Sequence, residues 1–84
     1  MIMPARPLID PQGATPVYRQ VADVLRRRIA SGELQPNRPV PSETQLEAEF
    51  EIARGTARKA IAVLREGGLV VTIPGRGTFV NPVD

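Results

Sequence analysis

The sequence predicts a small, mainly α-helical domain that ends in a β-hairpin. Two long stretches place apolar residues at the spacing of one helix face, about every 3.6 residues. A shorter stretch between them starts with Ser42 and Gln45, a pair typical of a helix N-terminus. Near the C-terminus, two β-rich pieces flank the tetrapeptide PGRG, which favours a tight hairpin. With 84 residues, the chain is long enough for one such domain.

The first predicted helix lies in the stretch TPVYRQVADVLRRRIASGEL. Thr15 is a candidate N-cap with Pro16 at the first helical position, and Ser31-Gly32 supplies the stop. The stripe expected to face the core consists of Val17, Val21, Val24, Leu25, Arg28 and Ile29. Residues 1–14 contain three prolines and show no periodicity, so we expect a flexible leader there.

The second predicted helix is short. It is preceded by the segment LQPNRPVPSE, whose prolines exclude a helix and in which Val40 fits a short extended piece. The Ser42–Gln45 pair then forms a capping box that begins the helix. Leu46 and Phe50, four residues apart, provide its apolar face, and we expect it to end by Glu51.

The third predicted helix lies in RGTARKAIAVLREGG and has two different faces. Its apolar face consists of Ala57, Ala60, Ile61 and Leu64, where the alanines allow a neighbouring helix to approach closely. The other face is basic with small residues between the charges, and carries Arg54, Gly55, Arg58, Ala62 and Arg65. Gly67-Gly68 provides a left-handed stop.

The predicted hairpin pairs residues 69–73 with residues 78–80. Pro74 opens the turn, Gly75 and Gly77 permit positive φ angles, and Arg76 is placed at the tip. The predicted order is therefore helix, short helix, helix and hairpin.

Composition excludes several classes of function. Cysteine and histidine are absent, which removes thiolate and imidazole metal ligands and the commonest general base. Ser42 and Thr56 lack a partner base, so we expect no enzyme, no metal and no cofactor. No apolar run approaches the ~20 residues of a membrane span, and the start lacks a signal-peptide pattern. We expect a cytoplasmic protein without membrane contact.

Charge is distributed unevenly, although the net charge is only +2. Residues 41–53 contain four glutamates and no basic residue, whereas the chain from Arg54 onward has five basic residues against two acidic ones. This distribution favours a polyanionic partner. We expect the glutamates of the second helix to form a solvated face that keeps that side of the domain off the partner.

Two helices joined by a tight link, the second basic and followed by a basic-tipped hairpin, have the layout of a winged helix-turn-helix. Arg54 and Arg58 carry long donors at the start of the third helix, and Gly55 and Thr56 leave the approach to base edges clear. The helix N-terminus favours phosphate. Arg76 at the wing tip is placed to enter an adjacent minor groove.

Three pieces, PVYRQVADVLRRRIASGEL, VPSETQLEAEFEIARGTARKAIAVLREGGLV and GRGTFV, resemble in this order the N-terminal DNA-binding domain of the GntR family of bacterial transcription regulators. The resemblance covers residues 16–80. It implies a winged helix-turn-helix domain at residues 15–81 that binds a palindromic double-stranded DNA operator as a homodimer, most often as a repressor. Family members generally continue into an effector-binding domain. The chain stops at NPVD, so we expect neither that domain nor a small-molecule effector within these residues.

The resemblance also implies which residues contact DNA. Phosphate contacts fall on Ser42 and Thr56, and a nearby contact of the second helix falls on Thr44. Arg54 and Arg58 read guanines and phosphates. The wing contacts fall on Gly75 and Arg76. Together with Gly55, which the residue pattern itself places on the approach, these are the predicted DNA-binding residues.

The chain departs from the family pattern at three positions. Glu51 stands where glycine is usual in the turn between the second and third helices, and it must adopt the same conformation or change the turn. Ala53 replaces a serine or threonine that caps the third helix, a loss of ~0.5–2 kcal/mol. Asn37 replaces a glycine, a mild change because asparagine tolerates positive φ.

Two alternatives to DNA readout stay open. The helix arginines of an arbitrary protein most often form a solvated face. A winged helix can also act as a protein-protein interaction module without operator binding, and the salt dependence of affinity separates this alternative from DNA binding. Arg26 and Arg27 fit a solvent-facing role better than base readout, and Tyr18 and Phe50 fit packing better than stacking on bases.

Overall fold

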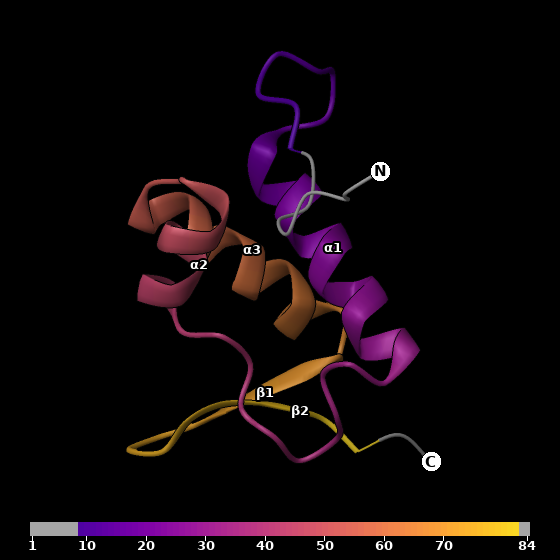
Figure 1. Cartoon of the computed structure of the whole chain (residues 1–84). Helices are drawn as coiled ribbons and strands as arrows, with labels where there is room; N and C mark the ends of the chain where they lie inside the picture. Colours follow the sequence, from indigo (N-terminus) through magenta and orange to yellow (C-terminus); the bar gives the residue numbers. More distant parts are fainter. Residues whose placement is uncertain (1–8, 83–84) are drawn as a thin grey trace.

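The computed structural model describes residues 9–82, and within them it has three helices followed by a two-stranded antiparallel hairpin (Figure 1). The elements are α1 (Val17–Ser31), α2 (Glu43–Phe50), α3 (Arg54–Glu66), β1 (Val70–Ile73) and β2 (Gly77–Val80). The predicted fold class, a winged helix-turn-helix, is confirmed. Each element lies within two residues of its expected bounds, since local periodicity and capping signals suffice to define them.

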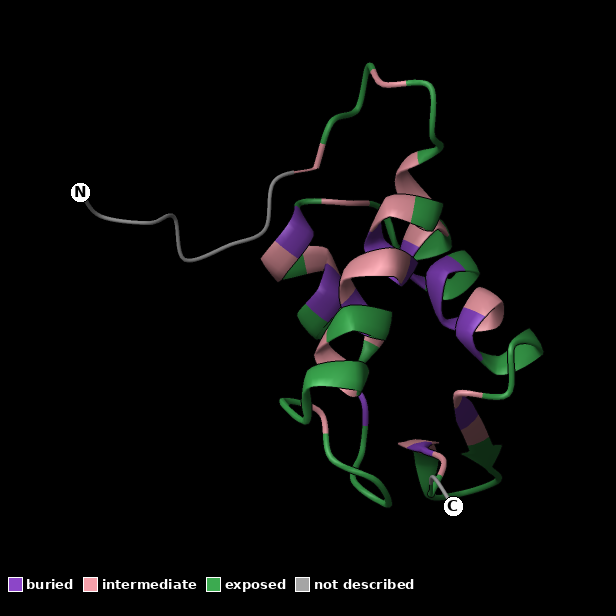
Figure 2. Ribbon diagram, turned by 90° about the vertical axis from the view of Figure 1, so that its right-hand side faces the viewer, coloured by how far each residue is buried: buried purple, intermediate pink, exposed green. Residues whose placement is uncertain are grey.

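The core lies where the inner faces of the helices meet (Figure 2). α1 packs along α3, and α2 packs against α3. All four apolar residues predicted for α3 are buried, with Ala57 and Ala60 at 0% exposure, so these small side chains allow the close approach expected of them. The other helices, the two strands and the linker before α2 supply the remaining buried residues: Val21, Ala22, Leu25, Val40, Leu46, Phe50, Val70 and Val80.

The start of α1 differs from the prediction. Pro16, not Thr15, is the N-cap, and no side chain caps the helix. The carbonyl of Pro16 accepts the first helical bonds, from the N–H groups of Arg19 at 3.0 Å and Gln20 at 3.1 Å. Thr15 therefore lies one residue too early to cap them. The predicted stop is confirmed, because Gly32 ends α1 with a φ of 88°.

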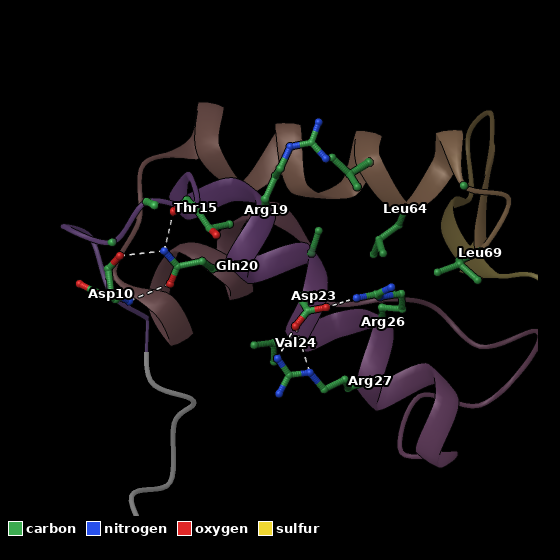
Figure 3. Close-up of a pocket in the computed structure, with 15 residues that line it drawn as sticks. Asp10, Thr15, Arg19, Gln20, Asp23, Val24, Arg26, Arg27, Leu64 and Leu69 are labelled. Atoms are coloured by element: carbon green, nitrogen blue, oxygen red, sulfur yellow. Dashed lines mark hydrogen bonds and ion pairs between the residues drawn. The ribbon is translucent and has the colours of Figure 1, made fainter.

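The side chain of Gln20 holds the chain ahead of α1 (Figure 3). Its Nε2 donates to the carbonyls of Asp10 and Thr15, both at 2.7 Å, and its Oε1 accepts from the N–H of Asp10 at 2.8 Å. Ile9 also packs against the core. Of the leader predicted at residues 1–14, the last six residues thus form a hydrogen-bonded turn against α1, and the first eight lie outside the described residues.

The predicted capping box begins α2. The Gln45 N–H donates to Ser42 Oγ at 3.1 Å, and the Ser42 N–H donates to Gln45 Oε1 at 2.8 Å. α2 ends at Phe50, as expected, and Glu51 then takes the left-handed conformation with φ 56° and ψ 51°. The glutamate thus adopts the conformation that glycine would favour, and the helix-turn-helix turn is kept.

The hairpin is attached to the body along one edge. In β1 and β2, Val70 pairs with Val80 and Ile73 with Gly77. The extended piece expected at Val40 is confirmed, because its N–H donates to the carbonyl of Thr78 at 3.0 Å. The backbone N–H of Asn37, a residue with a φ of 65°, donates to the carbonyl of Val80 at 2.8 Å. The linker before α2 therefore lies beside β2 and fixes the wing to the helices.

Candidate nucleic-acid interface

The structure brings the predicted residues of the two helix starts together. Arg54 is the first residue of α3 and Arg58 lies one turn further, and their side chains are 59% and 66% exposed. The buried alanines on the opposite face of α3 hold the arginines outward. Glu43, the first residue of α2, lies within 4 Å of both arginines, so the two helix starts are adjacent.

The polar residues at these helix starts are accessible. Ser42 and Thr44 are exposed at the N-terminus of α2, although Ser42 Oγ is already engaged in the capping box. Thr56 is half-buried in the first turn of α3. A Cβ on Gly55 would meet nothing within 4 Å, and its φ does not lie in the left-handed region. The fold therefore does not require glycine at this position, whereas close approach of a ligand to α3 would.

The glutamates of α2 correct one expectation. They do not form a solvated face directed away from the interface. Glu47 Oε2 accepts from Arg54 Nε at 3.1 Å, and Glu43 Oε2 accepts from Arg58 Nε at 3.4 Å. Residues four apart share one helix face, and this face of α2 turns toward α3 because the neighbouring face, with Leu46, is buried in the core. The matching four-residue spacing of the glutamates and the arginines is the sequence signal that could have revealed the pairing.

The third glutamate of α2 has a different role. Glu49 pairs with Arg28 of α1, whose Nη1 donates to Oε1 at 3.1 Å and whose guanidinium lies 5.7 Å from the centroid of the Phe50 ring. The hydrogen bond that Arg28 donates to the Glu49 carboxylate raises the pKa of Arg28 above its ordinary value. Arg28 is 16% exposed, so its predicted place at the edge of the core is confirmed.

The predicted wing residues lie in the hairpin turn, apart from the two helix starts. Gly75 and Gly77 have φ angles of 77° and 121°, and Arg76 stands exposed between them at the turn. In Figure 1 the hairpin tip extends toward the same side of the molecule as α2. Arg65 of α3 donates to Thr72 of β1 at 3.0 Å, which links the wing to the third helix.

Sequence reasoning missed a basic and aromatic cluster next to Arg58. The side chains of Lys59 and Arg19 lie over the Tyr18 ring, with Nζ and Cζ at 5.7 Å and 5.4 Å from its centroid. Such cation–π contacts order long basic side chains at a surface. Lys59 follows Arg58 directly, but its proximity to α1 depends on the packing of α1 on α3.

Two other kinds of site are absent from the part of the chain that the structure describes. Among residues 9–82, no group of three or more acidic, histidine or cysteine side chains could hold a metal ion. The same residues contain no helix of the length and apolar character that crossing a bilayer requires. A groove runs along α1. The chain ahead of α1, α1 itself and the C-terminal part of α3 line it, with Asp10, Arg19, Asp23 and Leu64 among the lining residues, and neither Arg54 nor Arg58 takes part.

The family model described as "Bacterial regulatory proteins, gntR family" matches residues 17–80, which span all five elements. The chain belongs to the GntR family. The resemblance noted from the sequence is thus confirmed. The residues matched form a DNA-binding winged helix-turn-helix, not an enzyme.

Two curated relatives are named as repressors. The chain is 42% identical over 73 residues to the HTH-type transcriptional repressor NagR of Bacillus subtilis, covering 87% of the chain and 30% of the relative. It is 44% identical over 69 residues to the mannosyl-D-glycerate transport/metabolism system repressor MngR of Escherichia coli, covering 82% and 29%. The chain therefore spans about a third or less of the length of these relatives.

Solved structures agree with the fold and with double-stranded DNA as the partner of this domain type. The DNA-binding domain of AraR in complex with operator ORR3 superposes with a TM-score of 0.75 at 34% identity, covering 94% of each chain. YtrA from Sulfolobus acidocaldarius, a GntR-family transcription factor, gives a TM-score of 0.79 at 31% identity, covering 93% of this chain and 66% of its own.

Proposed function

We propose that this domain directs a transcription repressor to a palindromic operator, which it binds as two copies with one α3 in each major-groove half-site. The observation that carries the proposal is the pair of exposed arginines at the start of α3, held outward by a buried alanine face. The names of NagR and MngR as repressors, and the operator complex of AraR(DBD), support it.

Each predicted residue has a proposed role. Arg54 and Arg58 read base edges, most directly guanine, which offers two acceptors to a guanidinium. Phosphates are bound by three hydroxyl side chains, Ser42, Thr44 and Thr56, near helix N-termini whose free N–H groups favour anions. Gly55 keeps the approach open. Gly75 shapes the wing tip, which carries Arg76 into the adjacent minor groove.

Two copies are proposed for a geometric reason. One recognition helix covers only a few base pairs, so useful discrimination requires two half-sites about one helical turn apart. The proposed DNA-binding domain spans residues 15–81, and its proposed location is the bacterial cytoplasm, where the chromosomal operator lies.

Selection of bound duplexes from a random DNA pool tests the proposal. We expect enrichment of a palindrome, and an affinity that falls steeply as salt rises because several phosphates are neutralised. Failure to enrich any motif at low salt, together with a salt-insensitive protein partner, would instead support the protein-interaction alternative.

Single substitutions assign the roles. Arg54→Ala and Arg58→Ala should each lower operator affinity by ~1–3 kcal/mol and relax the preference at one position in each half-site. Arg76→Ala should weaken binding to all duplexes more evenly. Arg26→Ala is a matched control, because Arg26 is also an exposed arginine paired with a carboxylate, that of Asp23 on α1. Unchanged operator affinity in both α3 variants would refute base readout.

A further inference from the structure

The two helices of the helix-turn-helix carry opposite charges that face each other. Glu43 and Glu47 lie one turn apart on α2, and Arg54 and Arg58 lie one turn apart on α3. The shortest ion pair joins Glu47 Oε2 to Arg54 Nε at 3.1 Å, and the Glu43 pairs are longer, at 3.4 Å and 3.9 Å. Two carboxylates thus stand within the surface that would meet a polyanion.

The pair between Glu47 and Arg54 is geometrically selective. It uses the Nε of Arg54, and therefore does not use the terminal nitrogens Nη1 and Nη2. These terminal nitrogens can form the fork that pairs with O6 and N7 of guanine. A carboxylate on Nε fixes the guanidinium plane at the first residue of α3 and directs the remaining donors outward.

The same carboxylate affects phosphate and base differently. A phosphate that approaches Arg54 meets the negative charge of Glu47, which is 32% exposed and therefore only partly screened by water. A guanine edge carries no net charge, so its approach is opposed far less. The expected consequence is a larger loss of affinity for phosphate-only contacts than for base readout.

We propose that Glu47 is a positioning residue for Arg54 that increases discrimination between operator and random DNA. The proposal rests on the operator binding proposed above. Glu47 holds Arg54 for end-on readout of a base and disfavours its use as a general phosphate contact. Glu43, which contacts both arginines at longer distance, adds to the negative charge that opposes phosphate at this surface.

Two substitutions at Glu47 separate charge from positioning. Glu47→Gln removes the charge but keeps an oxygen that can accept from Arg54 Nε, whereas Glu47→Ala removes both. Glu66→Gln is the matched control, because it changes the net charge equally at the exposed C-terminal end of α3. Affinity is measured for the selected operator and for a random duplex of the same length, over a range of salt.

For Glu47→Gln we expect random-duplex affinity to rise about fivefold to tenfold and operator affinity to change by less than about threefold. For Glu47→Ala we expect the same rise on random DNA and, in addition, a loss of preference at the base pair that Arg54 reads. Glu66→Gln should leave the ratio of the two affinities unchanged.

Three results distinguish this proposal from the one on which it rests. If the wild-type domain enriches an operator but Glu47→Gln raises both affinities by the same factor, Glu47 acts only through net charge and the inference is overturned. An unchanged base preference in Glu47→Ala overturns the positioning role. If the wild-type domain enriches no motif, the operator proposal itself fails.

In the free protein, the Arg54 Nε–H should exchange with water faster in Glu47→Ala than in the wild type, and equal rates would refute the pairing directly.

Discussion

Replacing Ala53 by serine should stabilise the domain, because α3 begins without a side-chain cap. Ala53 is the N-cap of α3 and has φ −73° and ψ 157°. Ser42, the N-cap of α2, has nearly the same angles, φ −69° and ψ 165°, and its Oγ accepts a backbone N–H at 3.1 Å. The backbone at Ala53 is therefore already arranged for a capping serine, whose Oγ would accept the N–H of Thr56.

The expected gain is about 1 kcal/mol, within the range of ~0.5–2 kcal/mol measured for such caps. The Ala53 position is exposed, so the new side chain displaces no packed atoms. For a domain of this size, 1 kcal/mol corresponds to a rise in Tm of roughly 4–8 °C. Thermal unfolding followed by far-ultraviolet circular dichroism measures the shift.

An isosteric pair isolates the hydroxyl group. Ala53→Thr and Ala53→Val have side chains of the same shape, and only threonine can cap, so the threonine variant should be more stable by about 1 kcal/mol. The reciprocal variant, Ser42→Ala, should lose a similar amount. Equal Tm values for the threonine and valine variants would show that α3 gains nothing from a cap and would refute the reasoning.

Three further outcomes are expected. The Glu51→Gly variant should be more stable than the Glu51→Ala variant by about 1 kcal/mol, as measured by chemical denaturation. Both substitutions remove the side chain, but only alanine is strained at a φ of 56°. Equal stabilities would show that the backbone at this position is not strained. Gly55→Ala should stabilise the free domain by about 0.5 kcal/mol and raise its Tm, because alanine favours the helix and open space surrounds the position. The added methyl group should nevertheless weaken operator binding, and undiminished binding would contradict close approach of DNA at this residue. Hydrogen bonds donated by Arg27, and to a smaller extent by Arg26, lower the pKa of Asp23 in the folded state. The ionised Asp23 should therefore stabilise the domain at pH values above its unfolded-state pKa, and this stabilisation should be lost as the pH falls through its folded-state pKa. An NMR titration that gives Asp23 an ordinary pKa, or an unchanged acid profile in Asp23→Asn, would contradict this.

Local chemistry made most of the fold predictable. The capping box at Ser42 and Gln45, the apolar spacing of α3 and the glycines around Arg76 each depend on residues within a few positions of one another. Such signals act through the geometry of one helix turn or one tight turn, so they can be recognised without tertiary contacts. The N-cap of α1 was misplaced by one residue because Thr15 and Pro16 offer adjacent starts that local rules rank closely.

At the candidate site, the sequence predicted the direction of the two arginines but not their partners on α2. The pattern of α3 showed that Arg54 and Arg58 face outward, because the opposite face is apolar. It did not show which side chains of another helix they meet. That depends on the angle of the turn at Glu51 and on the burial of Leu46 against α3, which together rotate one face of α2 toward the arginines.

The sequence by itself determined the elements, their order, the outward direction of the basic residues and the family. Only the tertiary structure decided that Glu47 accepts from Arg54, that Gln20 holds the turn at Asp10, and that Val40 extends the wing. These contacts join residues 7, 10 and 38 positions apart in the chain, the last through Thr78. Their geometry is set by how the buried faces pack. Matching four-residue spacing makes the Glu47–Arg54 pair possible, but periodicity by itself does not select the partner across a packed interface.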